Sequence, residues 1–174
     1  MIGGREYAIN SDFRDVLEVL EILTDPELNQ YVRTRVALTL FYDGFEKMPE
    51  ADYAEACNWM VDFIDLGEED DGVRRAKTID WEQDRMLIAA EVNKVAGVEV
   101  RALEYLHWWT FMAYFHSIGE GQLSFIVGIR DKLNKSKRLE KHEAEFYRNN
   151  RSRVDLKQKL TKKEEQTLDK WLGK

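Results

Sequence analysis

Apolar residues recur along this chain at the three- and four-residue spacing of amphipathic α-helices, and no segment alternates with the two-residue period of a half-buried strand. Helical faces are clear in residues 12–23, 49–67, 80–96 and 123–133. We therefore predict an all-α protein of about seven to eight helices. The helices are expected to form a single compact domain with a possible short C-terminal appendage.

The most apolar stretch runs from Val100 to Ile118 and contains two of the five tryptophans, Trp108 and Trp109. Its polar residues follow one another three apart and would form one narrow stripe on a helix: Arg101, Glu104, His107 and Thr110. Two charged residues in that stripe argue against a membrane span, since each costs about 3 kcal/mol at the bilayer centre. We expect a central buried helix with both tryptophans in the core.

Turn and capping residues predict several helix ends. The sequences Thr24–Glu27 and Asp80–Gln83 have the pattern of capping boxes, so each is expected to start a helix. Gly67 and Gly97 are expected to end the helices that precede them, because glycine readily adopts the left-handed conformation of a C-terminal cap.

Charge is distributed unevenly along the chain. Residues 1–72 carry 18 acidic and 5 basic side chains, a net charge of −13, whereas residues 73–174 carry a net charge of +6. The acidic run near residue 70 has no apolar period and is typical of a linker. The expected organisation is an acidic lobe 1–67, a linker 68–78, a second lobe 79–153 and a basic amphipathic segment 154–174.

A single cysteine, Cys57, excludes an internal disulfide framework and favours a reducing compartment. It lies on an apolar helix face without a nearby histidine in sequence, so we interpret it as a small buried hydrophobic residue and not a nucleophile. The first residues lack the apolar core of a signal peptide, and nothing in them predicts export.

Candidate catalytic groups are few. Glu104 and His107 have the i, i+3 spacing of di-metal helical bundles, but the further ligand pair and carboxylates of such sites are missing. The carboxylates of Asp80, Glu82 and Asp84 suit the first turn of a helix, where negative charge is favourable. Glycine-rich phosphate loops and nucleophile-elbow motifs are also missing. We predict no enzymatic activity, no metal and no cofactor.

A basic stretch around Lys135, Lys137 and Arg138 mixes cations with aromatic residues, as a nucleic-acid-binding surface does. Interleaved glutamates dilute its field, and ion pairs along a solvated helix explain the same pattern. Nucleic-acid binding is therefore the less favoured hypothesis.

The last residues contain a short amphipathic pattern with its own capping box. Leu168, Trp171 and Leu172 form its only apolar face. A helix of this kind either docks back on its own domain or binds in a partner's groove, and the sequence does not decide between them.

Five strings in the chain are similar to those of one known family: Asp80–Asp84, Leu106–Phe111, Ile129–Arg130, Leu139–Lys141 and Phe146–Asn150. Together they resemble the bacteriophage Gp-fifteen (Gp15) family over about residues 7–160. Genes of this family tend to lie between those of the major tail subunit and the tape measure protein, a position that in related phages usually encodes tail assembly chaperones. The resemblance brings no catalytic or binding residue with it.

The resemblance implies a non-enzymatic tail assembly chaperone that acts on the tape measure protein in the host cell cytoplasm. The charge asymmetry and the apolar end also allow self-association. Two alternatives remain, a nucleic-acid-binding phage protein and a structural component retained in the virion.

Overall fold

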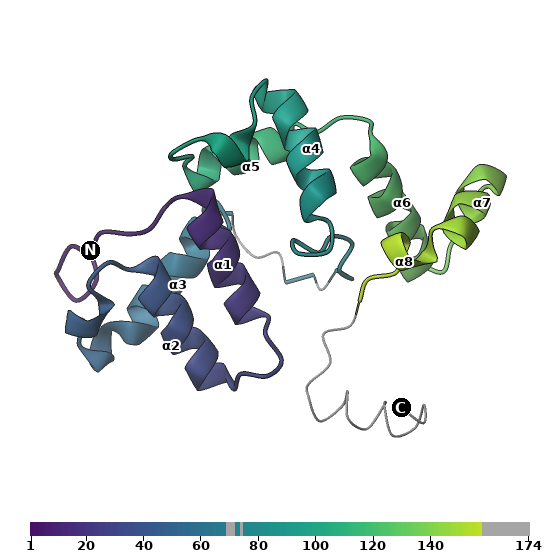
Figure 1. Ribbon diagram of the computed structural model, residues 1–174. Helices are drawn as coiled ribbons and strands as arrows, with labels where there is room; N and C mark the ends of the chain where they lie inside the picture. Colours follow the sequence, from purple (N-terminus) through teal and green to yellow (C-terminus); the bar gives the residue numbers. More distant parts are fainter. Residues whose placement is uncertain (69–71, 74, 158–174) are drawn as a thin grey trace, which may run out of the picture. The chain divides into compact units, whose positions relative to one another are not determined.

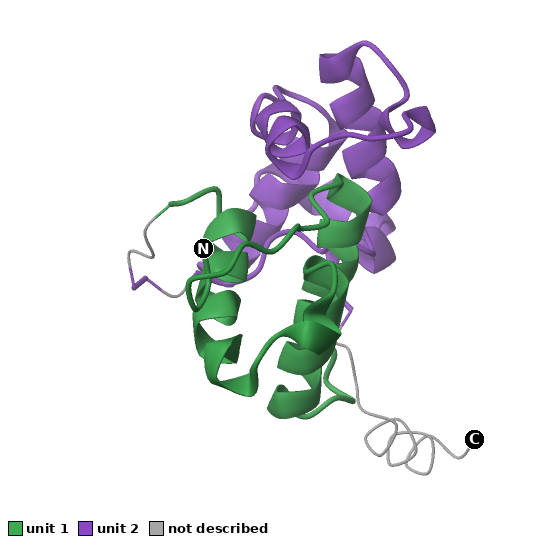
Figure 2. Cartoon of the chain, turned by 90° about the vertical axis from the view of Figure 1, so that its left-hand side faces the viewer, with its two compact units in different colours: residues 1–69, 158–174 green, residues 70–157 purple. Residues whose placement is uncertain are grey.

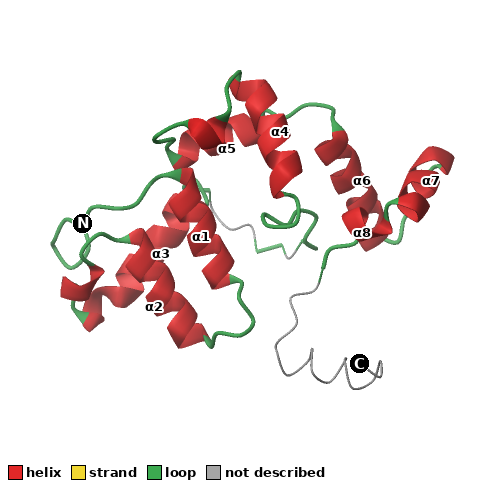
Figure 3. Ribbon diagram, in the orientation of Figure 1, coloured by secondary structure: helices red, strands yellow, loops and turns green. Residues whose placement is uncertain are grey.

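The structure, a computed structural model, describes residues 1–68, 72–73 and 75–157. Within these residues the chain forms eight α-helices and no strand, which confirms the all-α prediction (Figures 1 and 3). The α-helices are α1 (Phe13–Leu23), α2 (Gln30–Phe41), α3 (Tyr53–Ile64), α4 (Arg85–Ala96), α5 (Trp108–His116), α6 (Gln122–Asn134), α7 (Lys141–Asn149) and α8 (Arg151–Val154). The 3₁₀ helices are η1 (Phe45–Lys47), η2 (Glu50–Asp52) and η3 (Val100–Ala102).

The described chain separates into two compact units, which Figure 2 colours separately. Unit 1 contains α1 to α3, and unit 2 contains α4 to α8 and extends through Lys157. The division falls within the stretch 68–78 that the sequence marks as a linker. The expected lobe boundary at residue 153 lies inside unit 2, where the next residue, Val154, is fully buried.

In unit 1, α2 packs against both α1 and α3. The N-terminal segment runs beside the end of α2, since the Asn10 amide donates to the Phe41 carbonyl at 2.8 Å and the Asp43 amide donates to the Ala8 carbonyl at 3.0 Å. The buried apolar side chains of the three helices are Phe13, Val16, Val19, Ala37, Leu38, Phe41, Ala56, Met60 and Ile64. Unit 1 therefore has its own core.

The expected capping box at Thr24 is wrong. Thr24 is the C-terminal cap of α1, and its hydroxyl donates to the Leu20 carbonyl at 3.0 Å. The next helix begins at Gln30, six residues later, with the Asn29 side chain as its N-terminal cap. Because Thr24 is engaged by the preceding turn, it does not start the following helix.

In unit 2, α4 packs against α5 and α6, and α8 packs against α6 and α7. The expected long helix from Val100 to Ile118 is wrong, because only Trp108–His116 is α-helical. His107 ends the preceding loop, and its Nδ1 accepts a hydrogen bond from the Trp109 amide at 3.1 Å. This side-chain cap starts a new helix where the apolar pattern alone predicts a continuous one.

The two adjacent tryptophans of α5 have different environments. Trp108 is 1% exposed and lies in the core, as predicted, whereas Trp109 is 49% exposed, which corrects the prediction for that residue. Neighbouring positions on a helix point about 100° apart, so a short helix that packs on one side buries one of them and not the other.

Gly97 is confirmed as the C-terminal cap of α4, with φ of 71° and an amide that donates to the Asn93 carbonyl at 2.9 Å. The cap expected at Gly67 is wrong by two residues, because Asp65 caps α3 and Leu66 already has φ of 61°. The Gly67 amide still donates to the Asp62 carbonyl, at 2.7 Å. Among the described residues, no helix has both the length and the apolar character that crossing a bilayer requires.

Candidate functional site

Trp81 anchors an aromatic cluster in unit 2. Its ring centroid lies 6.1 Å from that of Trp108, 6.4 Å from that of Phe111 and 5.0 Å from that of Phe115. The turn before α4 is thereby packed on one face of α5. Trp81, Trp108 and Phe111 belong to strings that resemble the Gp15 family, so these strings meet in the core.

Arg130 of α6 is the polar centre of the same unit. Its guanidinium forms a bidentate ion pair with Asp84, at 2.6 and 3.0 Å, and the two side chains are 4% and 2% exposed. The remaining donors reach the carbonyls of Val154 at 2.6 Å, Arg153 at 2.8 Å and Thr78 at 3.0 Å. All five guanidinium N–H donors are therefore used, which is what a buried arginine requires.

The carboxylates that precede α4 differ in role. Asp80 accepts hydrogen bonds from the amides of Glu82 and Gln83 at 3.1 and 2.8 Å and pairs with Lys77 at 2.6 Å. Burial opposes its ionisation, but the Gln83 amide and the Lys77 ammonium outweigh burial and hold the pKa of Asp80 below its usual value. Asp80 thus stabilises a turn, and α4 itself begins only at Arg85.

Asp84 does not have the capping role expected for it. Besides its pair with Arg130, its carboxylate accepts from the Asp80 amide at 3.0 Å. The expected first-turn role is therefore wrong for Asp84, because its carboxylate pairs with a cation from another helix.

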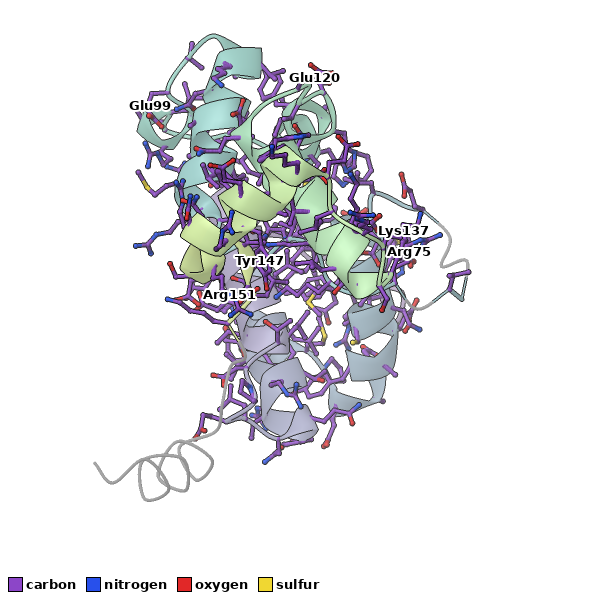
Figure 4. All side chains as sticks on the ribbon, turned by 90° about the vertical axis from the view of Figure 1, so that its right-hand side faces the viewer. Arg75, Glu99, Glu120, Lys137, Tyr147 and Arg151 are labelled. Atoms are coloured by element: carbon purple, nitrogen blue, oxygen red, sulfur yellow. The ribbon has the colours of Figure 1, made fainter. Side chains whose placement is uncertain are left out.

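The Gln83 side chain binds the backbone of the last residues of unit 2. Its side-chain nitrogen donates to the Asp155 carbonyl at 2.9 Å, and its side-chain oxygen accepts from the Lys157 amide at 2.9 Å. Tyr147 donates to the Asp155 carboxylate at 2.8 Å, and Arg151 lies over the Tyr147 ring at 5.4 Å (Figure 4). We call residues 153–157 the clamped segment, because Gln83 and Arg130 hold their backbone.

The three basic residues proposed to bind a partner are all exposed in unit 2. Lys135, the cap residue of α6, pairs with Asp131 of that helix at 2.7 Å, whereas no ion pair of Lys137 or Arg138 is found within the described part of the chain. In the view of Figure 4, Lys137 lies at the same edge of unit 2 as Arg75. The structure thus keeps the three together on the connection between α6 and α7.

The other proposed contact residues, Leu168, Trp171 and Leu172, lie outside the described residues. Both alternatives for their segment, docking on its own domain and binding in a partner's groove, stay predictions.

The Glu104–His107 spacing does not produce the geometry that a di-metal bundle needs. Glu104 precedes α5 in a loop, and His107 caps that helix through its Nδ1. The two side chains therefore do not share a helix face. In the described ranges no group of three or more potential metal ligands is found. Burial raises the pKa of the Cys57 thiol, which favours the unreactive protonated form.

The structural roles of Arg130 and Gln83 were not anticipated from the sequence, although the signal for Arg130 was present. Arg130 lies four residues after Ile126 and one after Ile129, so it falls on the apolar face of α6. A cation on such a face needs a buried anion. The sequence does not indicate which of the many carboxylates supplies it.

A family model described as bacteriophage Gp15 protein matches residues 1–156 of the 174-residue chain. No match was found among curated proteins. None was found among solved structures. The matched range covers all helices of the described residues and ends within the clamped segment.

Proposed function

The chain belongs to the bacteriophage Gp15 family, and from this membership we propose that it is a non-enzymatic tail assembly chaperone that acts on the tape measure protein. A long helical tape measure protein exposes apolar stripes before the tail tube encloses it, and exposed stripes of that kind aggregate. A protein that covers them in the host cell cytoplasm needs binding surfaces and no cofactor.

The observation that carries the proposal is the clamped segment. Gln83 and Arg130 fix the backbone of residues 153–157 immediately before the segment that contains Leu168, Trp171 and Leu172. An apolar face in a segment that begins at a fixed point of unit 2 is suited to bind the apolar helix of a partner.

Exposed apolar side chains on the described units support the same role. Met86 of α4 is 62% exposed, and Trp59 of α3 is 52% exposed. Methionine adapts to irregular apolar partners, and tryptophan is enriched where proteins bind one another.

The test is co-expression of the tape measure protein of the same phage with the full chain and with a chain that ends after Lys157. The cut is placed there because an earlier end, near Arg153, would remove buried Val154 and carbonyl partners of Arg130. Soluble tape measure protein that co-purifies with the full chain is the expected result. Loss of the complex on truncation assigns the contact to the last residues.

A matched pair of variants separates apolar contact from charge in that segment. Replacing Leu168, Trp171 and Leu172 by alanine is expected to abolish co-purification. Replacing Lys162 and Lys163 by alanine is expected to leave it intact. If the tape measure protein stays insoluble with every chain, the chaperone proposal is wrong.

The two alternatives give different outcomes. Retention in the virion predicts the protein in purified particles. Nucleic-acid binding predicts a gel shift that weakens steeply with salt and with loss of Lys135, Lys137 and Arg138. The two aromatic residues of α7 are already engaged, since Phe146 packs on Phe125 with ring centroids 5.1 Å apart and Tyr147 lies under Arg151.

A further inference from the structure

The connection between α6 and α7 presents cations on a fixed backbone. Ser136 adopts φ of 52°, its amide donates to the Leu133 carbonyl at 3.0 Å, and the Lys137 amide donates to the Lys132 carbonyl at 2.7 Å. This is the hydrogen-bond pattern of a Schellman motif, formed here with serine in the left-handed conformation at a cost of about 1 kcal/mol. We call residues 135–138 the cationic turn.

The far side of the connection is fixed as well. The Glu140 amide donates to the Glu143 carboxylate at 2.8 Å, which closes the first turn of α7. Lys137 and Arg138 are thus held between two ordered helix ends. Little backbone conformational entropy is therefore lost when a partner binds them.

Three carboxylates near the cationic turn pair with lysines: Asp131 with Lys135, Glu143 with Lys132, and Asp80 with Lys77. A fourth, the exposed Glu140, lies 3.6 Å from His142. The Asn134 side chain donates to the Lys77 carbonyl at 3.2 Å and so joins this region to the segment that carries Arg75. Lys137 and Arg138 therefore give this connection an excess of positive charge, and Figure 4 labels Lys137 at this edge of unit 2.

The complementary feature is in unit 1. Asp15, Glu18 and Glu21 follow one another three apart on α1, all are exposed, and no ion pair of theirs is found in the described part of unit 1. Six residues of helix span about 9 Å, so these three carboxylates form an acidic stripe of about that length.

The acidic stripe is unfavourable for its own helix. Acids three apart repel one another, Glu21 lies in the last turn, and that turn contains no basic residue to offset the helix dipole. A cationic surface placed against α1 would relieve this repulsion.

We propose that the cationic turn binds the acidic stripe of a second copy of this chain. Residues 1–72 carry a net charge of −13 and residues 73–174 a net charge of +6, so the two halves of neighbouring copies attract each other head to tail. A contact between two different surfaces is heterologous and closes into a ring or continues along a line of copies. The contact is independent of the tape measure protein, so it is tested on the purified chain alone.

The test is sedimentation velocity of the full chain over a range of concentrations. Exposed ion pairs are weak and screened by salt, so oligomers are expected at about 0.01 M ionic strength and monomer at about 1 M. Lys137→Glu/Arg138→Glu and Glu18→Lys/Glu21→Lys are each expected to weaken association by about tenfold or more. Their equimolar mixture is expected to associate again, because each reversed surface then meets a complementary one.

The control is Arg85→Glu/Arg148→Glu, which changes the net charge of the chain by the same amount as reversal of the cationic turn. Both arginines are exposed and outside the two proposed surfaces, so association is expected to be unchanged. Three results overturn the proposal: a monomer at low salt, an equal loss of association in the control, or a mixture of the reversed variants that remains monomeric while circular dichroism shows both to be folded.

Discussion

Arg130 and Asp84 form a fully buried, bidentate ion pair that joins α6 to the turn before α4, with N–O distances of 2.6 and 3.0 Å. The same guanidinium holds the carbonyls of Arg153 and Val154. One side chain therefore connects three segments that are distant in sequence, and the geometry of the clamped segment depends on it.

Arg130→Met is expected to lower the free energy of unfolding by about 3 to 5 kcal/mol, because it leaves the Asp84 carboxylate buried without its cation. Urea unfolding followed by circular dichroism measures the change. Lys135→Met on the same helix removes only an exposed pair and is expected to change stability by less than about 0.5 kcal/mol. Equal losses of stability for the two substitutions would contradict a stabilising role for the buried Arg130–Asp84 pair.

Trp108→Ala is expected to cost about 3 to 5 kcal/mol, as for other large buried aromatic side chains. Trp109→Ala is expected to cost roughly 1 kcal/mol, since about half of that side chain is exposed. Denaturant midpoints of the two variants give the comparison. A larger loss for Trp109 than for Trp108 would show that the burial of the two side chains is reversed.

Tyr42→Phe removes the hydrogen bond from the Tyr42 hydroxyl to the Ala56 carbonyl, 2.9 Å long and buried, and is expected to cost about 1 kcal/mol at neutral pH. Burial raises the pKa of Tyr42 from 10.0 to about 12. A raised folded-state pKa stabilises the fold below pH 10.0, and this contribution is lost as the pH rises through about 12.

Between pH 10.0 and about 12 the wild type is therefore expected to lose more stability than Tyr42→Phe. The difference between their free energies of unfolding is expected to shrink over that range. Unfolding curves at several alkaline pH values check this. A constant difference would mean that Tyr42 does not titrate differently in the folded and unfolded chains.

Gly128→Ala and Gly121→Ala are expected to act in opposite directions. Gly128 lies inside α6 with open space where a Cβ would be placed, so alanine is expected to stabilise by about 0.5 to 1 kcal/mol. At Gly121 a Cβ would lie 2.7 Å from the buried Glu91 carboxylate, and alanine is expected to destabilise by roughly 1 kcal/mol. Thermal unfolding of both variants is the measurement, and a stabilised Gly121→Ala chain would contradict the packing around Glu91.

The sequence by itself determined the class and much of the element order. Helical periodicity predicted the positions of α1, α3, α4 and α6, and Gly97 predicted the end of α4, because these features depend on local backbone preferences and on which face is apolar. The strings of the Gp15 family were likewise readable without a structure, and the family is confirmed.

The tertiary structure decided what local pattern leaves open. His107 divides the apolar stretch because its side chain caps α5, so Trp109 leaves the core although it belongs to the same string as Trp108. The partner of Arg130 is 46 residues away in sequence, and no local rule selects Asp84 among the 33 acidic residues. Such pairing is fixed only when helices pack, because a buried charge must be matched by whichever group the packing places beside it.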